Sequence, residues 1–399
     1  MKKNMTLNFQ MALMMLLQYM MYAVWWVPLA AYLTNLEVGS SQKALILSSM
    51  AIGCMASPLI GMLADRFFAA QKVLAGLNLI NAIMLFGAGM TRNTDILFFC
   101  LLFAMLAYMP SWSLTSSIAM THIPSEQFPR VRVFGSIGWV VSGIFSVIFI
   151  RLLNIDFDGT HIPFYCGAGV SLFAVITNLT LPDTPPLAKG QKATLIDAFG
   201  LGTIQMMKNR NFAIFIVLSF LSMIPFAMYY SYFSEFLLYI KTKYISVTIN
   251  WGVLFEMGFM LLVPLAIKKI GLRKTMVLGL VALIIRYLAF YTGVMTAQPW
   301  MYYIGILIHG LIFGFFYVGG QIYIDKKAPK HLKSQAQGFI FLVTFGLGLL
   351  VGNFLCARII DQYKTISGYN WDGIWGVTTL LSVILLILFV VFFRKLEVE

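Results

Sequence analysis

Charged residues are nearly absent from about twelve long apolar stretches of this chain, and this exclusion constrains the fold more than any other feature. Only 11% of the 399 residues are charged and 60% are apolar, whereas a soluble domain usually carries about 25% charged residues. A helix needs roughly 20 apolar residues to cross a bilayer, and the chain offers that length repeatedly. The sequence therefore predicts a polytopic membrane protein.

Each apolar stretch is expected to be helical, because backbone groups in lipid have no water partner. Runs such as Leu380–Phe393 do not alternate as the strands of a membrane barrel would. We predict an all-α membrane protein with twelve transmembrane helices. The spans are 8–32, 42–63, 71–90, 95–119, 133–153, 162–181, 211–238, 245–267, 274–294, 299–324, 335–357 and 373–393.

Basic residues set the expected orientation, because cytoplasmic loops carry an excess of Lys and Arg. With the N-terminus inside, 20 of the 28 basic residues fall on the inner side and 7 on the outer side. We therefore expect both termini in the cytoplasm. Topology and contact with anionic lipids then account for the net charge of +13, and nucleic-acid binding is not needed.

The longest linker follows the sixth span and opens with Leu181-Pro-Asp-Thr-Pro-Pro186, a sequence that stops a helix. We predict a six-helix half at 1–181, a cytoplasmic linker at 182–210 with an amphipathic helix at Thr194–Lys208, and a second six-helix half at 211–399. This organisation is typical of major facilitator transporters.

A short motif in the loop after span two supports that interpretation. Gly61, Asp65 and Arg66 match the superfamily's Gly-x-x-x-Asp-Arg loop, in which the charged pair can bridge helix ends as a gate latch. The alternative is a solvated turn with an incidental ion pair. The corresponding loop of the second half keeps Gly271 and basic residues but has no Asp.

Several longer stretches resemble the nucleoside:proton symporter family. The most extensive is Phe128-Pro-Arg-Val-Arg132-Val-Phe-Gly-Ser136-Ile-Gly-Trp139, and shorter matches occur from span one to span eleven in the family's order. The shorter matches are Gln18 with Trp25, Asp65–Lys72, Ala107–Pro110, Ile285–Tyr287 and Ser334–Gly338.

The resemblance implies a major facilitator fold that takes up nucleosides with a proton across a bacterial inner membrane. In the family, the positions matched by Arg132, Ser136 and Trp139 line the central site. The family's acidic residue in span eight falls on Glu256, and its aromatic segment in span ten falls on His309 and Phe313.

The chain also departs from the family at positions that bear on the substrate. Gly314 replaces a common aspartate, and Ala227, Tyr230 and Val253 stand where amides are usual. A site without those amides should discriminate bases weakly, so we expect tolerance across purine and pyrimidine nucleosides. A sugar, glycoside or other small polar metabolite remains the alternative cargo.

Glu256 is the leading candidate proton carrier, because it lies about eleven residues from either end of its span. A carboxylate near the midplane is desolvated and can load and unload a proton as access alternates. The alternative is a permanent structural pair with Arg286, at similar depth in the next span. His309 is a second candidate for proton coupling, although a lone histidine is more often a hydrogen-bonded core residue.

Further candidate substrate contacts come from aromatic and amide side chains. Trp25, Trp139 and Phe313 are expected to stack on a planar base, and Tyr230 belongs to the same group of candidates. Gln18 and Gln321 are buried amides that can meet hydroxyls, or equally bond another helix. Glu235 is either an outer-gate or ribose contact, or an interfacial carboxylate under an aromatic belt.

The sequence offers no sign of enzymatic chemistry. It has no phosphate-binding Gly-x-x-x-x-Gly-Lys-Ser/Thr motif, no metal cluster and no Ser/His/Asp arrangement, so we expect no cofactor and no metal. The four cysteines fall inside spans, where cysteine behaves as a small hydrophobe. We expect a monomeric transporter of a nucleoside-like molecule and protons, in contact with lipids; a membrane sensor is the less favoured alternative.

Overall fold

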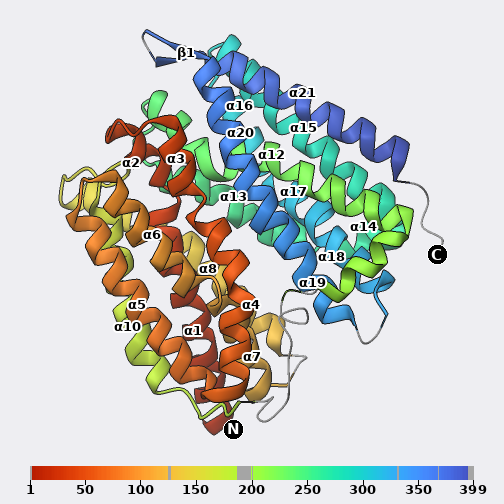
Figure 1. Ribbon diagram of the computed structural model, residues 1–399. Coiled ribbons are helices and arrows are strands. Elements are labelled where there is room, and N and C mark those ends of the chain that lie inside the picture. Colours follow the sequence, from red (N-terminus) through yellow and green to blue (C-terminus); the bar gives the residue numbers. More distant parts are fainter. Residues whose placement is uncertain are drawn as a thin grey trace. The chain divides into compact units, whose positions relative to one another are not determined.

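The computed structural model describes residues 2–124, 127–186, 199, 201–329, 332–366 and 368–393. These residues are helical apart from turns and one hairpin of β1 (Lys364–Thr365) and β2 (Gly368–Tyr369) (Figure 1). Eleven helical stretches are long and apolar enough to cross a membrane, and Ile245–Met260 is a shorter apolar helix. Twelve transmembrane helices therefore fit the described chain.

The chain divides into two compact units. The first comprises Met1–Leu195 and Phe233–Asn250, and the second comprises Ile196–Tyr232 and Trp251–Glu399. The six-plus-six division expected from the sequence stays a prediction, because Phe233–Asn250 comes from the expected second half and groups with the first unit. Of the amphipathic helix expected at Thr194–Lys208, the described part is a 3-10 helix, η2 (Leu201–Lys208); the rest lies outside the described residues.

Prolines interrupt two spans of the first unit that were expected to be continuous helices. The helix is interrupted at Val27–Pro28 and again at Met109–Pro110. Proline causes such breaks because it has no backbone N–H to donate. The helices of this unit are α1 (Lys2–Trp26), α2 (Leu29–Asn35), α3 (Ser40–Leu47), α4 (Ser49–Phe67), α5 (Ala70–Met90), α6 (Thr94–Tyr108), α7 (Ser111–His122), α8 (Phe128–Val141), α9 (Gly143–Val147), η1 (Ile148–Leu152) and α10 (Ile162–Leu179).

Close packing in the first unit centres on α1, which lies against α8 and α10. Gly138 of α8 has no room for a side chain, since a Cβ there would collide with the Leu16 carbonyl of α1. The glycine spacing of the Phe128–Trp139 motif thus lets the two helices approach closely. That approach positions the side chains of α8 that are discussed below.

In the second unit, span ten and span eleven each contain a π-helical segment. These are η3 (Phe313–Val318) and η5 (Leu342–Gly348), and such segments often occur at functional sites. The other helices are α12 (Arg210–Tyr239), which belongs to the first unit from Phe233 onward, α13 (Ile245–Met260), α14 (Val263–Ile270), α15 (Leu272–Met295), α16 (Trp300–Leu307), α17 (His309–Ile312), α18 (Gly319–Lys327), α19 (Lys333–Phe341), α20 (Leu349–Gln362) and α21 (Trp371–Phe392).

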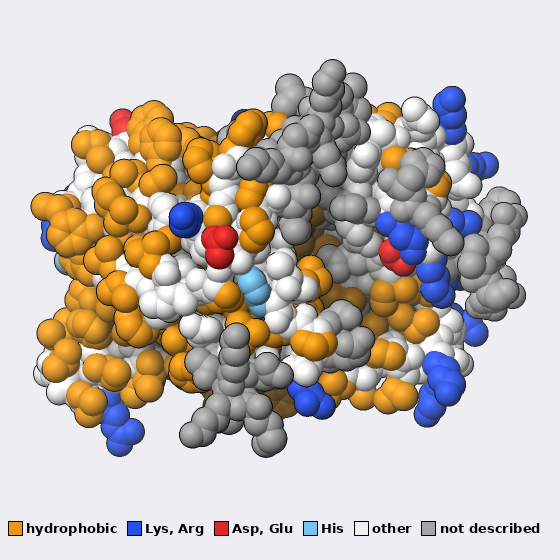
Figure 2. All heavy atoms as spheres, turned by 90° about the horizontal axis from the view of Figure 1, so that it is seen from below, with side chains coloured by type: hydrophobic (Ala, Val, Ile, Leu, Met, Phe, Trp, Pro, Cys, Tyr) orange, Lys and Arg blue, Asp and Glu red, His pale blue; other side chains and the backbone are white. Residues whose placement is uncertain are grey.

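The surface is rich in apolar side chains, as Figure 2 shows for one face. Large exposed examples include Phe86, Phe99 and Phe103 in the first unit, each half exposed or more. Exposed apolar surface of this extent would be unfavourable in water. It fits helices whose outer faces contact lipid.

Candidate functional site

Three ionisable side chains from three helices form a network in the interior of the second unit. The Nε2 atom of His309 on α17 lies 3.4 Å from Oε2 of Glu256 on α13. The Nδ1 atom of the same ring lies 2.8 Å from Nη2 of Arg286 on α15. His309 therefore lies between the carboxylate and the guanidinium, and the network is a chain of three groups.

Two glycines bring the helices of this network together. A Cβ added to Gly310 would lie 2.5 Å from the Cα of Glu256, and one added to Gly252 would lie 2.9 Å from the Ile306 carbonyl oxygen. Only glycine permits backbones to approach this closely. The close approach of α13 to α16 and α17 places the Glu256 side chain beside His309.

Arg286 is fully buried and is held by a carbonyl and a ring as well as by His309. Its Nε donates to the Gly305 carbonyl at 2.9 Å, and its guanidinium carbon lies 4.0 Å from the ring centroid of Tyr229. A guanidinium over a tyrosine face is a cation–π contact. None of the described residues forms a direct ion pair with Arg286.

Aromatic rings continue from this network along η3. His309 lies 5.4 Å from the ring of Tyr229 and 6.2 Å from that of Phe313, and Phe313 lies 5.9 Å from Tyr317. The expected contact Tyr230 stacks on Phe226 at 5.2 Å, and Phe226 meets Tyr317 of this row edge to face at 5.0 Å. Such a row of rings offers flat faces for a planar ligand.

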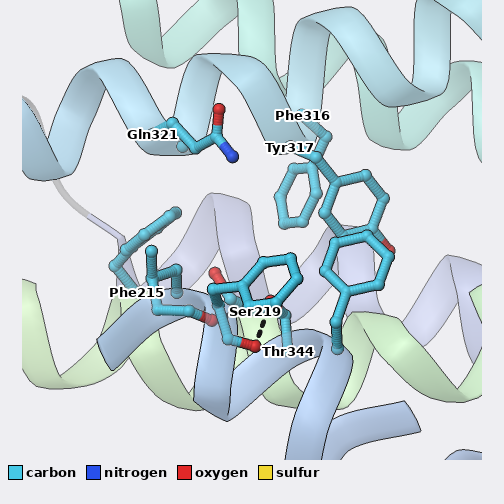
Figure 3. Close-up of a pocket in the computed structure, with 10 residues that line it drawn as sticks. Phe215, Ser219, Phe316, Tyr317, Gln321 and Thr344 are labelled. Atoms are coloured by element: carbon cyan, nitrogen blue, oxygen red, sulfur yellow. Dashed lines mark hydrogen bonds between the residues drawn. The ribbon is translucent and has the colours of Figure 1, made fainter. Parts of the chain in front are cut away.

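A small pocket lies at the other end of the aromatic row and includes Gln321 (Figure 3). Its volume is about 20 Å³, so it holds about one water molecule. Both π-helical segments contribute to its wall. The lining residues are Phe215, Ser219, Phe316, Tyr317, Gly320, Gln321, Ile340, Phe341, Thr344 and Phe345.

In the first unit, Arg132 lies over an aromatic ring. Its guanidinium carbon is 4.4 Å from the ring centroid of Tyr19, and that ring stacks on Trp112 at 5.7 Å. Arg132 is only partly buried. Its guanidinium carries five N–H donors, and its role as a substrate contact stays a prediction.

Trp139 lies two turns after Arg132 on α8, with Ser136 one turn after it, and both are partly buried. The Trp139 ring meets Tyr22 edge to face at 5.5 Å, and Trp25 meets the same tyrosine at 5.7 Å. The indole N–H groups of Trp25 and Trp139 have no hydrogen-bond partner among the described residues. Both N–H groups are buried, so the part of Trp139 that is left partly exposed is not its donor.

Two expected substrate contacts already have protein partners. Gln18 is fully buried, and its amide bonds Asn78 and Ser111. Glu235, 1% exposed, pairs with Lys43 at 2.7 Å. These contacts fill hydrogen-bonding positions that a substrate would otherwise use, and the substrate roles stay predictions.

Some residues of the site have no clear sequence signal, and one expected motif falls outside the description. Nothing in the sequence marks Lys43 or Tyr19 as functional, because Lys43 is one of the basic residues expected on the outer side and Tyr19 is one of many tyrosines. Gly61, Asp65 and Arg66 belong to the last turns of α4. The structure describes the backbone there but not these three side chains. The latch therefore stays a prediction.

Comparison with known proteins gives consistent matches along the whole chain. A family model described as "Nucleoside H+ symporter" matches residues 5–397. The transporter YegT of Escherichia coli (strain K12) is 35% identical over 405 residues, which cover 98% of this chain and 94% of YegT. The xanthosine permease of the same strain is 26% identical over 404 residues, covering 96% and 95%.

A solved structure shares the fold. A crystal structure of a variant of the nucleoside transporter NupG aligns with a TM-score of 0.90 at 24% identity, covering 97% of this chain and 100% of that one. The all-α major facilitator fold expected from the sequence is confirmed by this likeness and by the helices described above.

Proposed function

The chain belongs to the nucleoside H+ symporter family, and we propose that Glu256 carries the proton that drives its uptake of nucleosides. The protein is a multi-pass secondary transporter and not an enzyme. Proton-coupled uptake needs an ionisable group that exchanges protons with the two sides of the membrane in turn. The network around Glu256 is the part of the second unit suited to that task.

The position of Glu256 supports its assignment as carrier. Its side chain is 19% exposed, and it lies four residues before the end of α13, near the middle of the stretch 245–270 that α13 and α14 form together. The other described carboxylates of the second unit, Asp325, Asp361 and Asp372, lie within the first or last three residues of their helices. Intramembrane carboxylates are costly and mark ion pathways.

Glu256 and His309 have different parts in this proposal. Proton loading makes the Glu256 carboxyl neutral, which lowers the cost of moving it through a low-dielectric environment. After proton release the carboxylate regains its charge, and the Nε2 side of His309 lies beside it to stabilise that charge. The loaded and unloaded states thus differ by one proton at Glu256.

We assign the nucleoside contacts to two sets of side chains, one polar and one aromatic. Arg132 and Ser136 offer donors to ribose hydroxyls, and Trp139 and Phe313 offer ring faces to the base. The partial burial of all four supports the assignment. Glu256 and His309 would meet polar edges of the substrate, and Gln18, Trp25, Tyr230, Glu235 and Gln321 are the further candidates.

We further propose a monomer in a bacterial inner membrane, in contact with lipids and with both termini in the cytoplasm. The excess of Lys and Arg on the expected inner loops supports this orientation. Fusions of a cytoplasm-active fluorescent protein to either terminus should fluoresce. Activity of a periplasm-dependent phosphatase at a terminus would contradict the orientation.

The decisive experiment is uptake of labelled nucleosides into vesicles, with and without an imposed pH gradient and with sugars as competitors. Glu256→Gln should abolish accumulation against a gradient but retain nucleoside exchange, because the amide binds without titrating. Asp361→Asn, near the end of α20, is the matched control and should accumulate nucleoside normally. Undiminished accumulation by Glu256→Gln would refute the carrier assignment, and inhibition by sugars but by no nucleoside would refute the substrate.

A further inference from the structure

We propose that Arg286 is a positioning residue, which fixes the tautomer of His309 so that the ring presents a single N–H to Glu256. This inference rests on the proposed role of Glu256, and it adds that Arg286 sets which nitrogen of the neighbouring His309 ring carries the proton. It follows from the hydrogen-bonding inventory of the three side chains.

The donor and acceptor roles in the network are set by the arginine. A guanidinium has five N–H donors and no acceptor, and Nη2 of Arg286 lies 2.8 Å from Nδ1 of His309. Nδ1 must therefore accept and carries no proton. The neutral ring then holds its proton at Nε2, the nitrogen 3.4 Å from Oε2 of Glu256.

Arg286 is itself held in place for this role. The bond from Nε to the Gly305 carbonyl and the ring face of Tyr229 fix the guanidinium from two sides. Full burial excludes water as a competing acceptor. The Nη2 donor consequently points at His309 without rotation of the side chain.

The fixed tautomer makes Glu256 the group of the network that changes charge. A second proton on His309 would have to reside at Nδ1, where it would point at an N–H of Arg286. The titratable and charged groups facing His309 among the described residues are Glu256 from α13, Arg286 from α15 and Tyr229 from α12. Of these, Arg286 alone blocks Nδ1.

Loss of Arg286 should therefore free His309 to titrate. In Arg286→Gln, the pH profile of nucleoside uptake should gain a transition that the unsubstituted protein lacks, because Nδ1 of His309 can then accept a second proton. The extra transition should vanish in the double variant Arg286→Gln/His309→Gln. A merely structural arginine would change the amount of folded protein but leave the shape of the profile unchanged.

A direct test reads the ring nitrogens of His309. The chain has four histidines, so histidine-selective ¹⁵N labelling with His309→Gln as the difference sample assigns the signals by NMR in lipid bilayers. At pH 6 the unsubstituted protein should show an unprotonated Nδ1 and a protonated Nε2. Arg286→Gln should shift His309 toward the doubly protonated form, and Arg286→Lys, which keeps a charge and donors only, should restore the single tautomer.

The matched control is Arg273→Gln on the same helix, since Arg273 also donates to backbone carbonyls but far from the network. It should leave both the His309 signals and the pH profile unchanged. An Nδ1-protonated His309 in the unsubstituted protein, or identical signals with and without Arg286, would overturn the inference. These signals do not depend on transport, so they stand apart from the Glu256→Gln result that decides the proposed function.

Discussion

The buried ion pair of the first unit allows a quantitative test of how this protein holds charge away from water. Lys43 on α3 and Glu235 on α12 lie 2.7 Å apart, with side chains 5% and 1% exposed. Lys43 also donates to the Thr34 hydroxyl at 2.9 Å. The second carboxylate oxygen of Glu235 has no hydrogen-bond partner among the described residues.

These contacts predict unequal effects for the two single substitutions. Lys43→Met leaves a buried carboxylate without its cation, and the free energy of unfolding should fall by about 3–5 kcal/mol. Glu235→Gln leaves an ammonium that still has the Thr34 hydroxyl and an amide oxygen nearby, so a smaller loss of about 1–3 kcal/mol is expected. The double variant Lys43→Met/Glu235→Leu should lose less than Lys43→Met alone, because no unpaired charge remains.

Denaturant titration of purified protein in detergent measures these differences. Lys333→Met is the matched control: Lys333 and Asp325 are 2.8 Å apart but 41% and 51% exposed, and an exposed pair contributes about 0–1 kcal/mol. If Lys43→Met destabilises the protein no more than Lys333→Met, the argument from burial is refuted. A double variant less stable than both single variants would refute the pairing.

Three further predictions concern other contacts. Gly310→Ala should reduce uptake by displacing the helix of Glu256, whereas Gly258→Ala, with open space around its Cβ, should not; uptake rates at equal expression compare them. Burial raises the pKa of Asp158, outside the spans, above its ordinary 3.8 although Ser246 and Ser146 donate to it. The folded state therefore binds this proton more tightly, so stability should fall as pH rises from 3.8 toward the raised pKa, and thermal unfolding of Asp158→Asn should lack that slope. Arg132→Ala should weaken nucleoside binding about tenfold or more through lost charged hydrogen bonds, measured by calorimetry, without an equal loss of stability.

Apolar length and the distribution of charge were sufficient to locate the membrane spans, because both express the cost of polar groups in lipid. Two sorts of interruption inside the spans differ in how far the sequence signals them. Those at Pro28 and Pro110 have a visible signal, since proline cannot donate a helical hydrogen bond. The π-helical segments Phe313–Val318 and Leu342–Gly348 have none, because they depend on how neighbouring helices pack.

The residues of the charged network can be identified from the sequence, but the contacts among them cannot. Glu256, His309 and Arg286 each stand out as ionisable residues within apolar spans. Their order in space does not follow from that, and the direct pairing of Glu256 with Arg286 was the natural alternative. The structure places His309 between the two, a relation among three helices that linear spacing cannot specify.

The departure from the family at Ala227 has a packing counterpart in the structure. Ala227 is fully buried, and a Cβ added to Gly352 would lie 3.1 Å from the Ala227 Cβ. An amide side chain at 227 would therefore have to displace α20, so small residues at both positions allow these helices to pack closely. Tyr230, one turn later, stacks its ring on Phe226. On this side of α12 the chain thus has packed small residues and aromatic faces at positions where the family resemblance implies amides. We therefore expect recognition of a nucleoside by stacking and ribose contacts, and not by the edges of the base.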